Sequence, residues 1–383
     1  MIFETVRMED ALEALIDYRG KTPQKENEGI VTLSAKSVRD GYIDYSQCYF
    51  ISQEEYNRFM VRGFPQVGDV LLTTEAPLGV TARLDRNDVA LAQRLLTLRG
   101  KTGLLDTGYL YYYLRSPVGQ AKLKERQTGT TVTGIKQAEF RRIEIELPPF
   151  DIQHKIVAVL ETIDEKIVIN KKINKNLSDQ IQAIYCNKFD PVTHTPSGCL
   201  SDICRYSSDR IPVSELTVST YYSTENMQPN KEGAVNATNL PSIQQTTRCH
   251  KGDVLISNIR PYFKKIVYVT EECGCSTDVL CFTPKKSELT AFLFGTLYID
   301  RFFEHMVTGS KGTKMPRGDK QQIMNYPVVI PSEESLKAYN NIIIPMLEQV
   351  SYNRAENIRL AALRDTLLPR LMSGEIDVSN LDI

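Results

Sequence analysis

The sequence lacks the features that would place the chain in a membrane or an export pathway. No apolar run approaches the roughly 20 residues that a membrane-spanning helix needs. The stretch from Met1 to Asp10 does not have the basic and then apolar layout of a secretion signal. The eight cysteines form no CxxC pair, and their spacing matches no usual pattern of zinc ligands. We therefore expect reduced thiols, no bound metal, no membrane association and residence in the cytoplasm.

The motifs of common catalytic centres are missing as well. Gly20-Lys21 and Gly100-Lys101 resemble the end of a phosphate-binding loop, but leucine stands where the glycine five residues earlier is required. No GxGxxG opens a βαβ unit, and no Asp/Asn-Pro-Pro-aromatic tetrapeptide of amino-methyltransferases is present. The four histidines sit in no triad-like or metal-like arrangement. The chain is therefore expected to have no catalytic centre and to bind no cofactor itself.

Size and charge leave the class of binding protein open. A chain of 383 residues fits two domains better than one. Hydrophobic residues make up 42% and charged residues 24%, which is typical of ordinary globular proteins. The formal net charge of −1 excludes a protein coated evenly with positive charge. A nucleic-acid binder can still have this charge if its basic residues gather on one face.

The chain contains one internal repeat. Three short matches occur in the same order, at an offset of 184 residues for the first and 183 for the other two. The order favours two copies of one unit of about 180 residues, a tandem duplication rather than a solenoid. Segments rich in β-branched residues alternate with short helical segments, so each unit is expected to be α+β. The matching pairs are Gly68–Leu71 with Gly252–Leu255, Gly129-Thr130 with Gly312-Thr313, and Pro148 with Pro331.

A heptad pattern follows the proline of each copy. Apolar residues spaced alternately four and three apart indicate a helix that packs lengthwise against another helix. Both seams contain asparagines at the same place, and a buried amide fixes register because it must find another amide. We expect the two helices to pair as an antiparallel coiled coil, although either could instead pack on its own domain. The seam residues are Ile163, Ile167, Asn170, Asn174, Leu177, Val350, Asn353, Asn357 and Leu360.

Two residues of the second helix stand apart. Arg364 is the one charged residue in the second seam, and Pro345 is expected to kink or split the first turns of the second helix. The predicted fold is therefore α+β, with two globular domains separated by two long paired helices in a pseudo-twofold tandem repeat. The expected bounds are 1–150 for the first domain, 151–188 for the first helix, 189–332 for the second domain, 333–373 for the second helix and 374–383 for a tail.

Basic, hydroxyl-bearing and aromatic residues cluster in corresponding parts of both units. Lysine, hydroxyl and glycine N–H groups donate to phosphate oxygens, while arginine and asparagine can pair with base edges. One such loop alone would more often be a solvated surface, and the duplication is what favours a DNA-binding surface. The candidate DNA-binding residues are Arg19, Lys21, Thr22, Lys36, Arg94, Thr130 and Lys136 in the first unit and Asn258, Arg260, Tyr262, Lys264, Lys265, Lys314 and Arg317 in the second.

The order of these motifs resembles that of the specificity subunits of type I restriction–modification systems, over essentially the whole chain. One departure is that Ile152 precedes Gln153, where members of that family usually have glutamate. The segments that carry the resemblance are Tyr18–Pro23, Leu147–Gln153, Gly252–Lys265, Gly312–Gly318 and Leu367–Ile376.

The resemblance implies a function and a set of partners. Each globular domain would be a target-recognition domain that reads one part of a bipartite target in double-stranded DNA. The helices would set the spacing between the two parts and dock two methyltransferase subunits, and motor–nuclease subunits would join for cleavage. S-adenosylmethionine, ATP and Mg²⁺ would be used by those partner subunits. The alternative is a coiled-coil scaffold whose domains bind protein or glycan, which predicts no salt-dependent affinity for duplex DNA.

Overall fold

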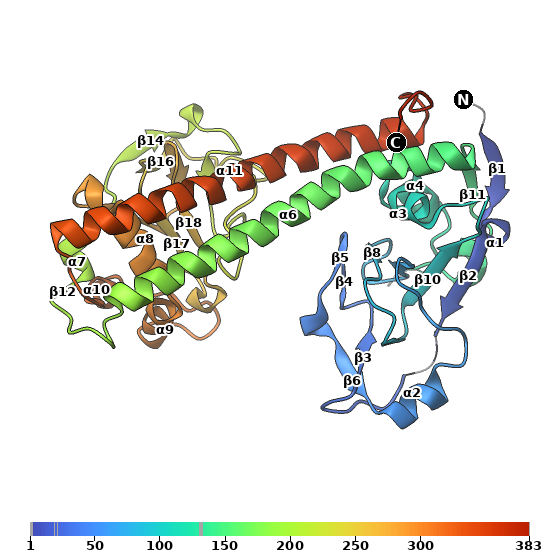
Figure 1. Cartoon of the computed structure of the whole chain (residues 1–383), viewed down its shortest axis with the longest axis horizontal. Coiled ribbons are helices and arrows are strands. Elements are labelled where there is room, and N and C mark those ends of the chain that lie inside the picture. Colours follow the sequence, from blue (N-terminus) through green and yellow to red (C-terminus); the bar gives the residue numbers. More distant parts are fainter. Residues whose placement is uncertain (1–2, 19, 21, 130–132, 383) are drawn as a thin grey trace. The chain divides into compact units, whose positions relative to one another are not determined.

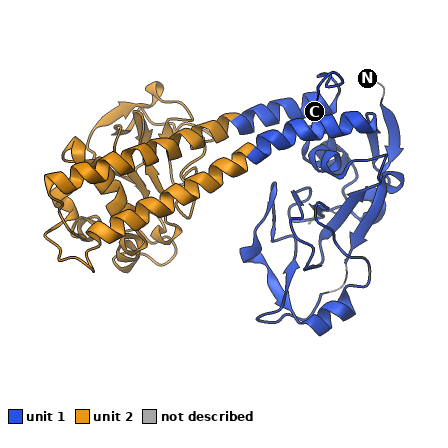
Figure 2. Cartoon of the chain, viewed as in Figure 1, with its two compact units in different colours: residues 1–165, 360–383 blue, residues 166–359 orange. Residues whose placement is uncertain are grey.

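The chain forms two units, each containing part of both long helices. The structure, a computed structural model, describes residues 3–18, 20, 22–129 and 133–382. Unit 1 consists of Met1–Glu165 with Leu360–Ile383, and unit 2 of Lys166–Arg359 (Figure 2). The chain therefore passes from unit 1 into unit 2 within the helix α6 (Phe150–Phe189) and returns within α11 (Glu333–Met372).

Short strands and helices lie beside the part of the long helices that belongs to unit 1 (Figure 1). Its strands are β1 (Glu4–Arg7), β2 (Leu12–Asp17), β3 (Ile30–Leu33), β4 (Val38–Arg39), β5 (Tyr42–Ile43), β6 (Tyr49–Ile51), β7 (Val70–Thr73), β8 (Thr81–Arg83), β9 (Val89–Leu91), β10 (Leu95–Gly100) and β11 (Glu144–Leu147). Its shorter helices are α1 (Met8–Ala11), the 3-10 helix η1 (Tyr45–Gln47), α2 (Gln53–Phe59), α3 (Thr107–Arg115), α4 (Pro117–Glu125) and α5 (Gln137–Arg141).

Unit 2 has the same kind of composition. Its strands are β12 (Gly198–Cys199), β13 (Cys204–Tyr206), β14 (Arg210–Pro212), β15 (Tyr221–Tyr222), β16 (Gln245–Cys249), β17 (Val254–Ser257), β18 (Ile266–Tyr268), β19 (Cys273–Cys275), β20 (Val279–Pro284) and β21 (Pro327–Val328). Its helices are α7 (Leu200–Ile203), α8 (Thr290–Tyr298), α9 (Asp300–Thr308) and α10 (Lys320–Met324), with the 3-10 helices η2 (Val213–Glu215), η3 (Pro261–Phe263) and η4 (Ser287–Leu289).

The tandem repeat expected from the three short motifs is confirmed. Helices α3, α4, α5 and α6 recur as α8, α9, α10 and α11, each beginning and ending 183 residues later. Strands β7 and β10 recur 184 residues later as β17 and β20. Each unit therefore contains corresponding helices and corresponding central strands. The α+β class is confirmed.

Of the sheets with three or more strands, each unit has one that is shared and one that differs. The antiparallel sheet β2-β10-β7-β8 of unit 1 has its counterpart in β13-β20-β17-β18 of unit 2. The second sheet is three-stranded in unit 1, in the order β6-β3-β9, and four-stranded in unit 2, in the order β14-β16-β19-β15. Buried side chains of the shared sheet and of α3 or α8 form the main core of each unit. The repeat thus preserves a framework and changes the layer beside it.

The repeated Gly-Asp motif shapes the turn that enters the central strand. Gly68 and Gly252 have φ angles of +92° and +95°, which glycine adopts without the clash that a Cβ would cause. The carboxylates of Asp69 and Asp253 each accept a hydrogen bond, over 2.8 Å, from the backbone N–H three residues earlier. This motif is therefore a structural turn of the framework.

The two long helices pair in antiparallel order, as the heptad pattern predicts. In unit 2 the side-chain amide of Asn170 donates to Oδ1 of Asn357 over 2.9 Å, and that of Asn353 donates to Oδ1 of Asn174 over 2.8 Å. Four residues forward along α6 correspond to four residues back along α11. In the repeat, Asn353 corresponds to Asn170 and Asn357 corresponds to Asn174. The pair Asn170–Asn357 therefore corresponds to the pair Asn353–Asn174. The contacts therefore have local twofold symmetry.

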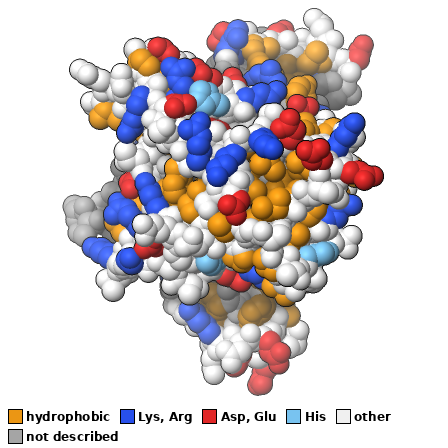
Figure 3. All heavy atoms as spheres, turned by 90° about the vertical axis from the view of Figure 1, so that its left-hand side faces the viewer, with side chains coloured by type: hydrophobic (Ala, Val, Ile, Leu, Met, Phe, Trp, Pro, Cys, Tyr) orange, Lys and Arg blue, Asp and Glu red, His pale blue; other side chains and the backbone are white. Residues whose placement is uncertain are grey.

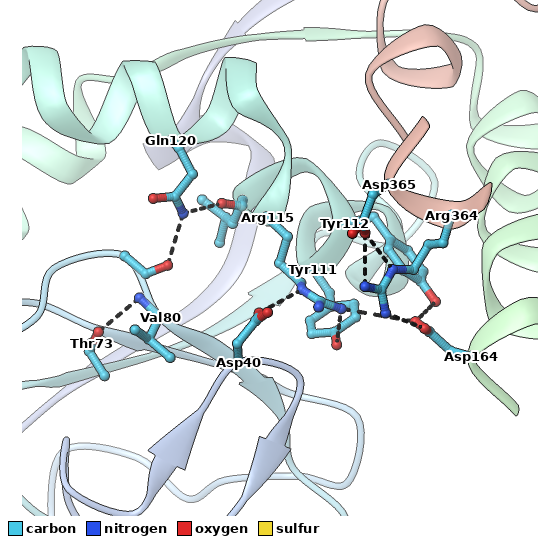
Figure 4. A network of polar contacts seen from close by, with 12 residues as sticks. Asp40, Thr73, Val80, Tyr111, Tyr112, Arg115, Gln120, Asp164, Arg364 and Asp365 are labelled. Carbon is cyan, nitrogen blue, oxygen red and sulfur yellow. Dashed lines mark hydrogen bonds and ion pairs between the residues drawn. The ribbon is translucent and has the colours of Figure 1, made fainter. Parts of the chain in front are cut away.

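In unit 1 the charged seam position is satisfied by an ion pair (Figure 4). Nη1 of Arg364 on α11 lies 2.8 Å from Oδ1 of Asp164 on α6. The hydroxyl of Tyr112 on α3 donates to the other oxygen of the same carboxylate over 2.9 Å. The corresponding residues in unit 2 are Ile181 and Leu347, which both belong to its apolar core. One seam position is thus filled by opposite charges in one unit and by hydrocarbon in the other.

The expectation that Pro345 splits the second helix is wrong. Helix α11 continues from Glu333 to Met372, and Pro345 lies exposed within it. Ile343 and Leu347 on either side are buried in the core of unit 2. Their burial offsets the one backbone hydrogen bond that a proline removes from a helix.

Replacing Asn353 by Ala is expected to lower the free energy of unfolding by about 1–3 kcal/mol, because the amide of Asn174 would stay buried without its partner. Urea denaturation followed by circular dichroism measures the loss. Asn341→Ala, an exposed asparagine of the same helix, is the control and should change the free energy by less than about 0.5 kcal/mol. Equal losses in both variants would contradict a specific role for the asparagine pair.

Replacing Arg364 by Ala is expected to lower the free energy of unfolding by about 1–3 kcal/mol, since Asp164 would lose its charge partner in a partly buried place. A double-mutant cycle with Asp164→Ala should give a coupling above about 0.5 kcal/mol. Arg359→Ala, at an exposed position of the same helix, serves as the control. Strictly additive losses from the two single variants would show that the pair does not contribute.

Candidate nucleic-acid interface

Three loops of unit 2 meet where the central strand β17 ends. We call residues 258–265, 276–278 and 309–319 the unit 2 junction. The backbone N–H of Asn258 donates to the carbonyl of Asp278 over 2.8 Å, and that of Arg260 donates to the carbonyl of Pro316 over 2.8 Å. The third loop is closed on itself by mutual backbone hydrogen bonds between Lys311 and Arg317, of 2.9 and 3.0 Å. Loops distant in sequence are thereby held at one place.

The corresponding loops of unit 1 meet in the same way. The unit 1 junction consists of residues 74–80, 92–94, 126–129 and 133–136. The N–H of Thr74 donates to the carbonyl of Arg94 over 3.1 Å, and the N–H of Ile135 donates to the carbonyl of Thr74 over 2.9 Å. Thr128 and Gly134 exchange backbone hydrogen bonds as their counterparts do in unit 2. The backbone of the junction is therefore part of the repeated framework.

One arginine–carboxylate pair lies on each junction. In unit 1, Nε of Arg94 is 2.7 Å from Oε1 of Glu75. In unit 2, Nη2 of Arg317 is 3.1 Å from Oδ1 of Asp278. All four side chains are at least one third exposed, so both pairs face solvent. The junctions thus carry fixed but accessible charges.

Arg260 holds a strained backbone conformation at the unit 2 junction. Its φ is +51°, in the left-handed region that side chains other than glycine rarely adopt, and Ala76 has the same φ at the corresponding place in unit 1. The Nε atom of Arg260 is buried and has no hydrogen-bond partner among the described residues. Tyr262 follows with half of its surface exposed, and its ring centroid lies 4.8 Å from that of Phe263. This loop therefore presents an aromatic side chain beside an arginine with an unused donor.

Two of the candidate lysines are directed inward. Nζ of Lys265 donates to the carbonyl of Thr224 over 2.5 Å, and burial lowers the pKa of this lysine. Nζ of Lys264 lies 3.0 Å from Oδ1 of Asp300, to which Nζ of Lys231 also comes within 2.7 Å. Burial by itself would raise the pKa of Asp300, but the hydrogen bonds from the two lysines outweigh it and the pKa is lowered. In this structure both lysines are therefore engaged by other residues of unit 2.

The remaining candidates are buried, exposed or outside the described residues. Asn258 is buried, with an Oδ1 that has no partner within the described part of the chain. Thr22, Lys36, Lys136 and Lys314 are exposed, and no ion pair involves these three lysines among the residues described. Arg19, Lys21 and Thr130 lie outside the described residues. Basic and acidic side chains are interspersed on the face drawn in Figure 3, with hydrophobic side chains between them.

The acidic residues of these loops were not predicted from the sequence. Glu75, Asp278 and Asp300 each hold a basic side chain in place, and Lys231 was not among the candidates. A signal was present, because the offset of 184 that aligns the Gly-Asp motifs also aligns Pro77 with Pro261. Extending that alignment would have marked the loops around both prolines as corresponding parts of one site.

The described residues contain neither a candidate membrane span nor a candidate metal cluster. No helix there combines the length and the apolar character needed to cross a membrane. No group of three or more His, Cys, Asp or Glu side chains in the described ranges is arranged to hold a metal ion.

Comparison with known proteins identifies both halves of the chain. The family model of the type I restriction modification DNA specificity domain matches residues 3–179 and again residues 197–363. The chain is 22% identical over 360 residues to the type I restriction enzyme MjaIX specificity subunit of Methanocaldococcus jannaschii, covering 86% of this chain and 82% of that protein. It is 28% identical over 177 residues to the MjaVIII specificity subunit of the same organism, covering 45% of this chain and 38% of that protein.

A solved structure supports the fold. The type I restriction–modification system S subunit from M. genitalium matches with a TM-score of 0.60 at 16% identity, over 96% of each chain. At this identity the likeness concerns the fold alone. The resemblance seen in the sequence motifs is confirmed by the family match.

Replacing Asp300 by Asn is expected to lower the free energy of unfolding by about 1 kcal/mol near pH 7, because Lys231 and Lys264 lose a half-exposed partner. The pKa of Asp300 is lowered in the folded protein, so its contribution is present above the ordinary carboxyl pKa and is lost as pH falls. The difference between the native chain and the variant should therefore shrink below about pH 4.

Denaturation at several pH values measures this dependence. Asp179→Asn is the matched control, because Asp179 pairs with Lys175 on the exposed surface of α6. A difference between Asp300→Asn and the native chain that stays constant down to about pH 2 would contradict the ion-pair assignment.

Proposed function

Because the chain belongs to the family of type I restriction modification DNA specificity domains, we propose that each of its two domain copies reads one part of a bipartite DNA target. The protein would act as the specificity subunit of a restriction–modification complex and would itself carry out no catalysis. The observation that carries this proposal is the duplicated loop junction, in which one backbone framework presents two different sets of side chains.

The difference between the two sets is what a bipartite reader requires. Sequence is read by side chains in the grooves, whereas backbone contacts with phosphate position the protein without reading bases. Arg94 occupies the framework position of Asp278, and Ala76 that of Arg260. Lys136 and Asp319 begin the corresponding helices α5 and α10. Two readers with such different charges are suited to two different half-sites.

The long helices supply surfaces for partner subunits. Several large apolar side chains of α6 and α11 are exposed, although their neighbours in the seam are buried or partly buried. We place the docking of two methyltransferase subunits on these outer faces, because exposed apolar patches on helices mark interaction surfaces. The residues are Val168, Ile169 and Ile173 on α6 and Tyr352, Ile358 and Leu363 on α11.

Chemistry would come from the partners. Adenine methylation with S-adenosylmethionine would belong to the methyltransferase subunits, and ATP- and Mg²⁺-dependent cleavage would belong to the motor–nuclease subunits. The whole complex would work in the cytoplasm, where the DNA is. A base to be methylated must leave the stack, and the specificity subunit would hold the duplex while a partner extracts it.

The test is modified-base sequencing of genomic DNA from cells with and without this gene, with the companion methyltransferase present in both. Loss of methyladenine from one bipartite motif with a fixed unread gap would establish the function. Arg260→Ala should relax or weaken recognition in one half of that motif only. Equal loss on every sequence would make Arg260 a phosphate contact, and no loss would remove it from the interface.

The scaffold alternative makes a different forecast for the purified chain. A specificity subunit should bind duplex DNA with an affinity that falls steeply as salt increases, because bound phosphates release counterions. A scaffold for protein or glycan should show no such dependence. Fluorescence anisotropy of a labelled duplex from about 50 to 200 mM salt distinguishes the two.

A further inference from the structure

The arginine–carboxylate pairs of the two junctions use opposite charges at the same framework position. Arg94 of unit 1 corresponds to Asp278 of unit 2. The backbone carbonyl of each accepts a hydrogen bond from the N–H of the residue that follows the central strand, β7 or β17. Arg94 finds its carboxylate on the loop after β7, whereas Asp278 finds its arginine on the loop before α10. The pair is therefore rebuilt in each unit from different loops.

Stability does not account for these pairs. The side chains of Arg94 and Arg317 are 55% and 54% exposed, and their carboxylates are 34% and 41% exposed. Ion pairs at such exposure contribute little to folding because water screens them and the side chains lose entropy. The junction itself is held by backbone hydrogen bonds that need neither side chain. A role outside folding remains for both pairs.

The chemistry of the pair matches one kind of base pair. Guanine presents two acceptors, N7 and O6, in the major groove, and its partner cytosine presents the N4 amino group as a donor. A guanidinium supplies two parallel donors, and a carboxylate beside it supplies an acceptor. In an A·T pair, adenine presents the acceptor N7 beside the donor N6 amino group. That donor would face the second guanidinium N–H, which is also a donor. The donors and acceptors of a G·C pair in the major groove therefore complement those of an arginine beside a carboxylate.

We propose that Arg94 with Glu75 and Arg317 with Asp278 each read one G·C base pair of their half-site, the arginine on guanine and the carboxylate on cytosine. This inference rests on the proposed function and deepens it. The printed contact joins Nε of Arg94 to Glu75, and Nη2 of Arg317 to Asp278. A guanidinium has five N–H donors, so donors remain for a base after one carboxylate is bound. The carboxylate holds the guanidinium in orientation before DNA arrives, which reduces the ordering cost of binding.

Modified-base sequencing of cells that carry Arg94→Ala or Arg317→Ala, with the companion methyltransferase, tests the proposal. The native motif should contain a specified G·C pair in each half. Each variant should relax one such position, in different halves, with a loss of discrimination of about 5- to 150-fold. Arg86→Ala and Arg205→Ala remove exposed arginines of units 1 and 2 away from the junctions and should leave the motif unchanged.

A second pair of variants separates charge from geometry and covers the case in which alanine prevents folding. Arg94→Lys and Arg317→Lys keep the charge but lose the fork that makes two parallel hydrogen bonds, so each should relax the same position as its alanine counterpart. Full specificity in the lysine variants, uniform weakening across all sequences, or relaxation of the same half by both arginines would overturn the proposal. Absence of any bipartite motif with the native chain would instead refute the proposed function.

Discussion

The pairing of four asparagines in the helix seam is the constraint on which the arrangement of the chain depends. An apolar seam alone tolerates a shift by one heptad, because one Ile or Leu can replace another against the facing helix. A shift would leave the amides of Asn170 and Asn174 facing hydrocarbon, and each buried amide without a partner costs about 1–3 kcal/mol. With the observed pairs formed, only one antiparallel register satisfies all four side chains. That register also brings Asp164 to Arg364 within unit 1.

Several of the motifs that identify the family build the framework. The Gly-Asp motif makes the turn into the central strand of each shared sheet. Gln153 is buried and bonds the carbonyls of Leu104 and Pro148, which ties the start of α6 to unit 1. Such residues recur because their backbone geometry recurs. The side chains suited to reading DNA stand at positions that the repeat does not preserve.

The sequence therefore predicted the framework better than the site. The repeat and the helix pair were accessible because periodicity and matching asparagines are local patterns in one dimension. The roles of Arg364, Lys264 and Lys265 were not, since each depends on a partner distant in sequence, such as Asp164 or Asp300. A lysine in a basic motif looks the same in the sequence whether it faces phosphate or a carboxylate of its own chain. Pro345 was misjudged because the burial of its neighbours in the core is a tertiary effect.

The separation of framework from reading side chains also has an energetic side. The free energy that holds each unit together comes from buried cores, from backbone hydrogen bonds at the junctions and from the satisfied polar groups of the helix seam. The exposed ion pairs at the junctions add little to it. A change of charge at position 94 or 278 can therefore be made without unfolding the unit. The two copies already differ in this way on one backbone, so duplication followed by substitution at these loops is sufficient to place two different sets of side chains on one fold.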